Sequence, residues 1–165
     1  MPILDPNTLE FISRSAEQTR RVGMRLGALL QLGDVVCLEG DLGSGKTTLV
    51  QGLASGWNSL DPVSSPTFVL VNVYRRQDGQ RLAHLDAYRL SGPEEADALD
   101  LDELTESGPL VVEWAGRIRP ALPEKRLWIR MNHVAEEQRS MQFDASGERY
   151  QKMITNLREQ MFGVI

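Results

Sequence analysis

The chain has 165 residues, of which 41% are hydrophobic and 25% charged, with a formal net charge of -5 and a sequence pI near 5.1. This length and composition predict one globular domain, residues 1–165, with a core of its own. No apolar run is long enough for a transmembrane helix and no secretory signal is apparent, so we expect a cytoplasmic protein without a membrane partner. Because acidic residues outnumber basic ones, tight binding to bare DNA or RNA is not expected.

The first elements in chain order are a strand, a helix and a second strand. Residues 9–13 favour a short strand, and the capping-box pattern from Ser15 to Gln18 predicts the start of a helix. Apolar residues then recur at helical spacing, and Gly33 is a plausible end of that helix. Residues 34–38 are almost continuously apolar, which predicts a short buried strand.

The middle and the end of the chain predict two hairpins and a closing helix. Residues 68–74 and 81–85 read as strands, and the Asp-Gly pair between them is typical of a hairpin turn. An acidic helix is expected at Pro93, and residues 110–112 form another apolar strand. A second hairpin is expected from residues 126–131 and 139–143, and an amphipathic last helix from about Glu148. The predicted sheet is therefore mixed rather than purely parallel.

Residues 40–47 match the pattern G-x-x-x-x-G-K-[ST] completely. The glycines let successive backbone N–H groups face one anion, at the positive end of the helix predicted for residues 46–54. Lys46 would neutralise the β and γ phosphates, and the Thr47 hydroxyl would bind Mg²⁺. A glycine-rich turn with an accidental lysine is the alternative, but a chance match is on the order of one per cent at average residue frequencies. The expected phosphate-binding residues are Asp41, Leu42, Gly43, Ser44, Gly45, Lys46, Thr47 and Thr48.

Two acidic residues directly follow apolar strands. Asp86 ends the run at residues 82–85, and Glu113 ends the run at residues 110–112. Ligands of parallel α/β folds gather at the carboxyl ends of the strands, so both acids are expected beside Lys46 and Thr47, where they would hold Mg²⁺ and water. A turn or cap residue is the alternative for each. Together these features predict an α/β, P-loop NTPase-like three-layer fold, whose mixed sheet has a parallel core and antiparallel hairpins.

Four other residues or segments have two interpretations each. The hydroxyl-rich residues 64–67 would form either a switch-like segment near the γ-phosphate or a plain loop. Trp114 would stack on a base or a partner, or belong to the core. His84 is expected to pack rather than to catalyse, and Cys37 to be a buried structural thiol.

The base is expected to be adenine. A guanine-specific GTPase needs an Asn-Lys-x-Asp segment, which the chain lacks. The Asp-x-x-Gly switch motif is also missing, because Asp86 is followed by Ala87, Tyr88 and Arg89. ATP is therefore favoured over GTP.

With these motifs placed, the chain resembles the TsaE (YjeE-like) family over nearly its whole length. These are small P-loop ATPases of bacterial tRNA threonylcarbamoyladenosine synthesis. Four motifs in this order and spacing carry the resemblance, and they occupy residues 40–48, 65–68, 84–90 and 112–114.

The resemblance implies a role for several residues. Thr47 and Glu113 would bind Mg²⁺, and Asp86 would serve as the Walker B acid with a catalytic role beside Lys46. Thr67 would be the switch-like threonine. The remaining residues implied at or near the nucleotide are Thr19, at a position near the adenine, Trp114, and Arg139. One departure is Asp100, which stands where the family often has glycine.

The resemblance also implies cofactors and partners. ATP and Mg²⁺ would be the cofactors, and the proteins TsaD and TsaB the partners. ATP hydrolysis would support turnover of that complex in modifying adenosine 37 of tRNAs that read codons starting with A. The chain would meet tRNA through its partners, and it would not itself transfer the threonylcarbamoyl group.

Two alternatives remain open at this point. A small-molecule kinase shares the P-loop and the size, although such kinases generally have an arginine-bearing lid and a mostly parallel sheet. A nucleotide-gated binding module would bind ATP with negligible turnover. No arginine stands at a recognisable finger position beside the motifs, so we expect a weak ATPase that its partners stimulate.

Overall fold

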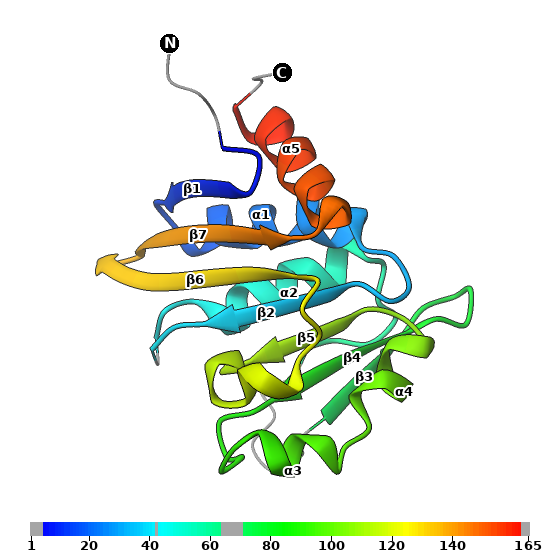
Figure 1. The fold of residues 1–165 in the computed structure, drawn as a ribbon. Coiled ribbons are helices and arrows are strands. Elements are labelled where there is room, and N and C mark those ends of the chain that lie inside the picture. The colour runs from blue at the N-terminus through cyan, green and yellow to red at the C-terminus, as the bar shows by residue number, and fades with distance from the viewer. Residues whose placement is uncertain (1–4, 42, 64–70, 163–165) are drawn as a thin grey trace.

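The computed structural model describes residues 5–41, 43–63 and 71–162. Seven described strands form one sheet in the order β1-β7-β6-β2-β5-β4-β3 (Figure 1). They are β1 (Thr8–Ser13), β2 (Val35–Glu39), β3 (Val71–Arg75), β4 (Arg81–Asp86), β5 (Leu110–Glu113), β6 (Arg126–Ala135) and β7 (Gln138–Ser146).

The centre of the sheet is parallel and both of its margins are antiparallel. Strands β6, β2, β5 and β4 run parallel to one another, whereas β1 and β7 at one margin and β3 at the other pair antiparallel. This confirms the expected mixed sheet. The carboxyl ends of the four parallel strands consequently meet at one edge, where ligands of α/β folds bind.

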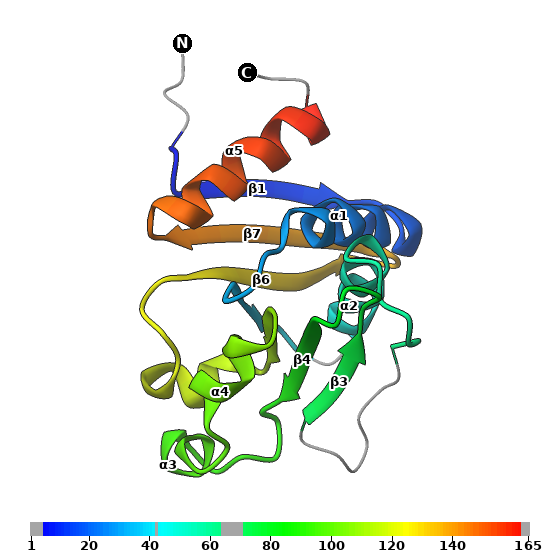
Figure 2. The same cartoon turned by 90° about the vertical axis from the view of Figure 1, so that its right-hand side faces the viewer.

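Helices cover both faces of the sheet. Figure 2 shows α1 and α2 on one side of the strands and α3 and α4 on the other. The described helices are α1 (Ala16–Leu29), α2 (Lys46–Gly56), α3 (Pro93–Asp97), α4 (Leu101–Glu106), the 3₁₀ helix η1 (Ala115–Ala121) and α5 (Glu148–Phe162). None of them combines the length and the apolar character needed to cross a bilayer.

Alternate side chains of the central strands supply two separate cores. In β2, Val36 and Leu38 pack with α1, α2 and α5, whereas Val35 and Cys37 pack against the segment that carries α3, α4 and η1. The continuous apolar run of this strand follows from burial on both faces, as expected for a central parallel strand. Cys37 is fully buried, and burial raises the pKa of its thiol to about 12, so its role is to pack.

Helices α1 and α2 approach each other closely through glycines. A Cβ atom at Gly23 would lie 2.4 Å from the carbonyl oxygen of Leu49, and one at Gly52 would lie 2.0 Å from that of Arg20. Such contacts are far shorter than any carbon–oxygen contact that packing allows, so the two backbones meet without side chains between them. This pairing fixes the position of α2, and therefore of the phosphate-binding loop at its start.

The sequence patterns did not predict two short helices, α4 and η1. The segment with α4 begins at Asp100, which adopts the left-handed conformation with φ 50° and whose carboxylate accepts a hydrogen bond from the N–H of Glu103. An aspartate tolerates this conformation better than most residues do, so it can replace the glycine often found there in the family. The 3₁₀ helix η1 follows Trp114, which is also left-handed with φ 57°.

Candidate nucleotide-binding site

The predicted phosphate-binding loop joins β2 to α2. Gly43 and Gly45 have positive φ values of 80° and 97°, which curl the backbone ahead of the helix. Gly40 is required for a different reason, because a Cβ atom there would lie 2.3 Å from the carbonyl oxygen of Met131 in β6. The cap residue of α2 is Gly45, which has no side chain to occupy the first N–H groups of the helix. These groups are thus available to an anion, as in other anion sites at helix N-termini.

Lys46 is held against the loop that precedes it. Its ammonium donates hydrogen bonds to the carbonyl oxygen of Gly40 and, at 3.0 Å, to that of Asp41, and it lies 4.2 Å from the ring centroid of Trp114. The residue is only 6% exposed. Burial lowers the pKa of this ammonium, while the negative charges of Glu113, Asp41 and Asp86 oppose that shift. The cation therefore faces a concentration of negative charge at the strand ends.

Asp86 and Glu113 end neighbouring parallel strands, as expected. The two residues are direct register partners of β4 and β5. Glu113 is 5% exposed and Asp86 is half-buried. Burial raises the pKa of the Asp86 carboxyl, and the charge of Glu113 adds to that effect. Two acids so placed favour a cation between or beside them.

Residues 43–48 and the two acids line one cavity of about 390 Å³. Its lining residues are Gly43, Ser44, Gly45, Lys46, Thr47, Thr48, Asp86, Glu113, Trp114 and Arg139. The cavity brings together most residues that the sequence nominated from three separate segments. Convergence of a lysine, hydroxyls and acids at the start of a helix is an arrangement suited to a metal–phosphate ligand.

His84 has a contact that sequence reasoning missed. It is fully buried, as expected of a packing residue, yet its Nε2 lies 2.5 Å from Oε2 of Glu113 and its Nδ1 lies 2.9 Å from the hydroxyl of Tyr74. The available signal was the alternation of β4, which puts residues 84 and 86 on the same face. Glu113, however, belongs to a strand whose pairing with β4 no local pattern predicts, and it lies 29 residues after His84 in the sequence.

Arg139, which the family resemblance implied near the nucleotide, lines the cavity. It projects from the start of β7 into the cavity, and its Nε donates to the carbonyl oxygen of Gly43 at 3.0 Å. Its Nη1 donates to the carbonyl oxygens of Glu136 and Gln138. These three bonds tie the β6–β7 turn to the phosphate-binding loop. The resemblance implied Arg139 near the nucleotide, but no local pattern predicted its bond to Gly43, which lies 96 residues earlier in the chain.

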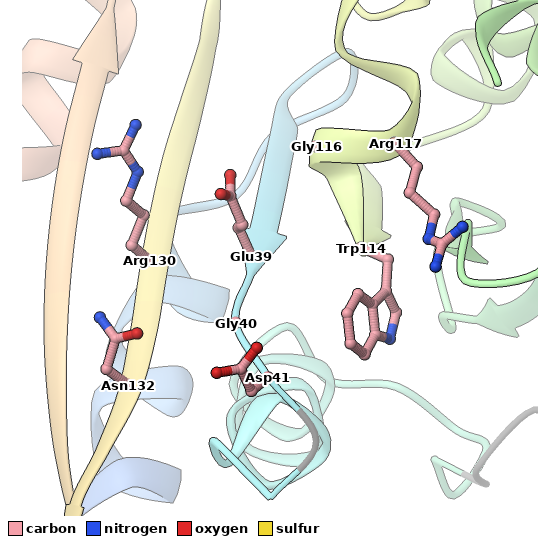
Figure 3. A pocket seen from close by; sticks show the side chains of 8 residues that line it. All are labelled: Glu39, Gly40, Asp41, Trp114, Gly116, Arg117, Arg130 and Asn132. Atoms are coloured by element: carbon pink, nitrogen blue, oxygen red, sulfur yellow. The ribbon is translucent and has the colours of Figure 1, made fainter.

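Trp114 lies between this cavity and a second one. Figure 3 shows its indole beside the loop, with Glu39 at the end of β2 and with Arg130 and Asn132 on β6. The second cavity, of about 450 Å³, is lined by Glu39, Gly40, Asp41, Trp114, Gly116, Arg117, Arg130 and Asn132. The half-buried tryptophan thus lines two cavities, with its ring against Lys46, and is not a fully buried core residue.

Four nominated residues are not among the described residues that line this cavity. Asp41 lines the second cavity instead. Thr19 is buried in α1, where its hydroxyl lies 2.6 Å from that of Ser13. Its position near an adenine stays a prediction. Leu42 and the switch-like Thr67 lie outside the described residues, as does the start of the strand expected from residue 68.

The donor set of the cavity fits Mg²⁺. Mg²⁺ is typically bound through one or two carboxylates, with phosphate oxygens and water completing six ligands, and it does not need an all-protein cage. The Thr47 hydroxyl and the carboxylates of Asp86 and Glu113 are hard oxygen ligands of this kind. In the described part of the chain no three His, Cys, Asp or Glu side chains form a metal cluster by themselves. A metal here would therefore be shared with a phosphate ligand.

The fold and the cavity define the class of protein: a P-loop nucleotide-binding protein, with the loop between the central strand β2 and α2 and two acids at the ends of adjacent strands. The family described as "Threonylcarbamoyl adenosine biosynthesis protein TsaE" matches residues 13–141. The chain belongs to the TsaE family, which takes part in the biosynthesis of threonylcarbamoyladenosine in tRNA.

Individual relatives agree with this membership. A protein of Streptomyces coelicolor, named tRNA threonylcarbamoyladenosine biosynthesis protein TsaE, is 43% identical over 79% of this chain and 93% of its own length. The protein of the same name from Bacillus subtilis is 37% identical over 90% of this chain and 93% of its own length. The crystal structure of Bacillus subtilis YdiB superposes with a TM-score of 0.77 at 32% identity, covering 93% of this chain and 95% of YdiB.

Proposed function

We propose that this protein is a Mg²⁺-dependent ATPase that supports the modification of adenosine 37 in tRNAs reading codons that start with A. The main observation that supports this proposal is that Lys46, Thr47, Asp86 and Glu113 line one cavity at the start of α2. A binding site for the triphosphate alone needs only the loop and the lysine. Two acids at the same place are what a metal-assisted hydrolysis adds.

Each residue has a distinct task in this proposal. The N–H groups of the loop and of the first turn of α2 bind the phosphates, and Lys46 exchanges its bonds to the loop carbonyls for phosphate oxygens. Thr47 and Glu113 would hold Mg²⁺, which neutralises charge on the phosphates when bound. Asp86 would orient the attacking water directly or through the metal. The indole of Trp114 contacts Lys46 and closes one wall of the cavity.

Arg139 is proposed to hold the loop and not to act as an arginine finger. Its guanidinium already bonds the carbonyl oxygens of Gly43, Glu136 and Gln138. To stabilise a transferred phosphate it would have to give up contacts that fix the loop. A finger supplied by another protein is worth about 10³ to 10⁵ in rate in related systems. We therefore propose slow hydrolysis by the isolated chain and stimulation by its partners.

The proposed partners are TsaD and TsaB, and the proposed compartment is the cytoplasm. The chain has a formal net charge of -5, which disfavours a large phosphate-neutralising surface for tRNA. The protein would therefore meet tRNA through the complex and would not transfer the threonylcarbamoyl group itself. Its contribution would be the hydrolysis of ATP during turnover of TsaB and TsaD.

Product analysis separates this proposal from its two alternatives. Purified protein is incubated with γ-labelled ATP and Mg²⁺, and the label is followed as free phosphate, as a phosphorylated acceptor or as unchanged ATP. We expect free phosphate. Label in an added small-molecule acceptor would identify a kinase, and ATP that binds but stays intact with and without the partners would identify a nucleotide-gated module.

A further inference from the structure

Three buried side chains form a continuous hydrogen-bonded chain across β3, β4 and β5. The hydroxyl of Tyr74 lies 2.9 Å from Nδ1 of His84, and Nε2 of His84 lies 2.5 Å from Oε2 of Glu113. Tyr74 is 3% exposed, His84 is fully buried, and Glu113 is 5% exposed. The chain therefore runs through the protein interior and ends at an acid that lines the nucleotide cavity.

The register of the sheet produces this alignment. Tyr74 pairs with Leu82 and His84 pairs with Val111, so each link joins a residue to the one two positions beyond its direct partner. Leu82 and Val111 belong to the core beneath α1 and α2, and alternation places the three polar residues on that face too. Because β4 is the middle strand, its residue 84 can contact both neighbouring strands at once.

The two contacts of His84 can run in one direction, from the phenol through the imidazole to Glu113. Burial raises the pKa of Tyr74 to about 12, so the phenol is neutral and can donate its proton to Nδ1. With Nδ1 accepting from the phenol, the Nε2–H of His84 donates to Oε2 of Glu113. A buried carboxylate without such a donor would be strongly destabilised. The imidazole thus holds Oε2 in place and leaves the other carboxylate oxygen for a ligand.

We propose that His84, supported by Tyr74, is a positioning residue that orients Glu113 for binding the metal of the metal–nucleotide complex. This rests on the proposed function, in which Glu113 is a Mg²⁺ ligand. In this proposal His84 does not contact the nucleotide and is not a catalytic residue. It fixes the rotamer of Glu113, which would bind the metal. Outer hydrogen-bond partners of metal ligands commonly have this role.

The proposal is tested with His84→Leu, His84→Gln and Tyr74→Phe. Leucine removes the donor, whereas glutamine can present an N–H near the position of Nε2. Leu82→Ala is the control, since Leu82 is a fully buried residue two positions earlier on the same face of β4. The readouts are Mn²⁺ binding in the presence of ADP by electron paramagnetic resonance, ADP binding without metal, and the Mg²⁺ dependence of phosphate release.

We expect His84→Leu to weaken Mn²⁺ binding and phosphate release by about 10- to 100-fold, the typical cost of losing such a partner. ADP binding without metal should stay unchanged, His84→Gln should restore most of the loss, and Tyr74→Phe should give a smaller loss. In the wild type, the Nε2 proton of His84 should give an exchange-protected NMR signal that moves in Glu113→Gln. Leu82→Ala should lower thermal stability without altering metal binding.

Different results overturn different claims. Wild-type Mn²⁺ binding in His84→Leu, or His84→Gln no better than His84→Leu, would reduce His84 to a packing residue and leave the proposed function intact. A loss in Leu82→Ala equal to that in His84→Leu would have the same meaning. If the wild type itself binds no metal with ADP and releases no phosphate, both proposals fall.

Discussion

Asp86 and Glu113 are register partners at the ends of the adjacent parallel strands β4 and β5, and both line the cavity of Lys46. Two acids at this spacing repel each other, and burial together with the charge of Glu113 raises the pKa of Asp86. In the proposed function a divalent cation would relieve that repulsion, and a nucleotide would supply its remaining ligands. We therefore propose that the two acids act together when a metal–nucleotide complex is bound.

The two acids should matter for hydrolysis more than for metal-free binding. Asp86→Asn and Glu113→Gln keep the size of each side chain and remove its charge. We expect each to lower Mg²⁺-dependent phosphate release by about 100-fold or more, because both act on the metal and the water. ATP binding in the presence of a chelator should change little. Glu159→Gln on α5 is the matched control, and an active Asp86→Asn or Glu113→Gln would show that its parent residue is a mere strand-end acid.

Lys46→Ala should abolish hydrolysis and weaken ATP binding. In the proposed function the ammonium binds the phosphates, and in the structure it is buried and bonded to the carbonyl oxygens of Gly40 and Asp41. A modest loss of stability, about 1 kcal/mol, is therefore expected as well. Nucleotide titration and thermal unfolding measure the two effects, with Lys152→Ala at an exposed position of α5 as the control. Normal ATP affinity and turnover in Lys46→Ala would disprove the site.

Arg139→Ala tests the loop-holding role of this residue. Loss of its bond to Gly43 should loosen the phosphate-binding loop and weaken ADP and ATP binding equally, by about 10-fold, as expected for one charge-assisted hydrogen bond. Titration with a fluorescent nucleotide measures both affinities, and Arg21→Ala, at an exposed position of α1, is the control. A loss confined to ATP would indicate contact with the γ-phosphate and an arginine-finger role instead.

The contact of α1 with α2 predicts a large stability effect at a small side chain. In Gly52→Ala the new Cβ would lie 2.0 Å from the carbonyl oxygen of Arg20, so the helices must separate. The gain in helix propensity is about 1 kcal/mol, and the overpacking cost of about 1 to 3 kcal/mol or more exceeds it. Thermal or denaturant unfolding should show net destabilisation. Gly92→Ala, where a Cβ atom meets nothing within 4 Å, should be neutral; equal stabilities would contradict the close approach.

Local sequence signals were sufficient for the phosphate-binding loop and for both acids. The loop is encoded in consecutive residues, and Asp86 and Glu113 each end an apolar run that is too short for a helix. The mixed sheet followed from two hairpin patterns. These features depend on neighbours within a few positions, which a sequence displays directly.

The remaining features depend on which strands become neighbours. The bond from His84 to Glu113 exists because β4 and β5 pair in parallel, and Arg139 reaches Gly43 because β6 lies beside β2. Strands β6 and β7 are longer than the apolar segments predicted at residues 126–131 and 139–143. Their length is set by the hydrogen-bonded pairing between the two strands. The left-handed Trp114 before η1 likewise has no local signature, since bulky residues rarely adopt that conformation.

Steady-state phosphate release by the purified protein, first alone and then with TsaB, TsaD and tRNA, tests the central claim most directly. We predict slow, Mg²⁺-dependent release by the isolated chain, a clear increase when TsaB and TsaD are added, and no release by Lys46→Ala under either condition. The increase is expected because Arg139, the arginine among the described residues that line the cavity, already bonds the loop and the β6–β7 turn. It is therefore not available to stabilise the γ-phosphate. Rapid release by the isolated chain that its partners leave unchanged, or no release under any condition, would contradict the account.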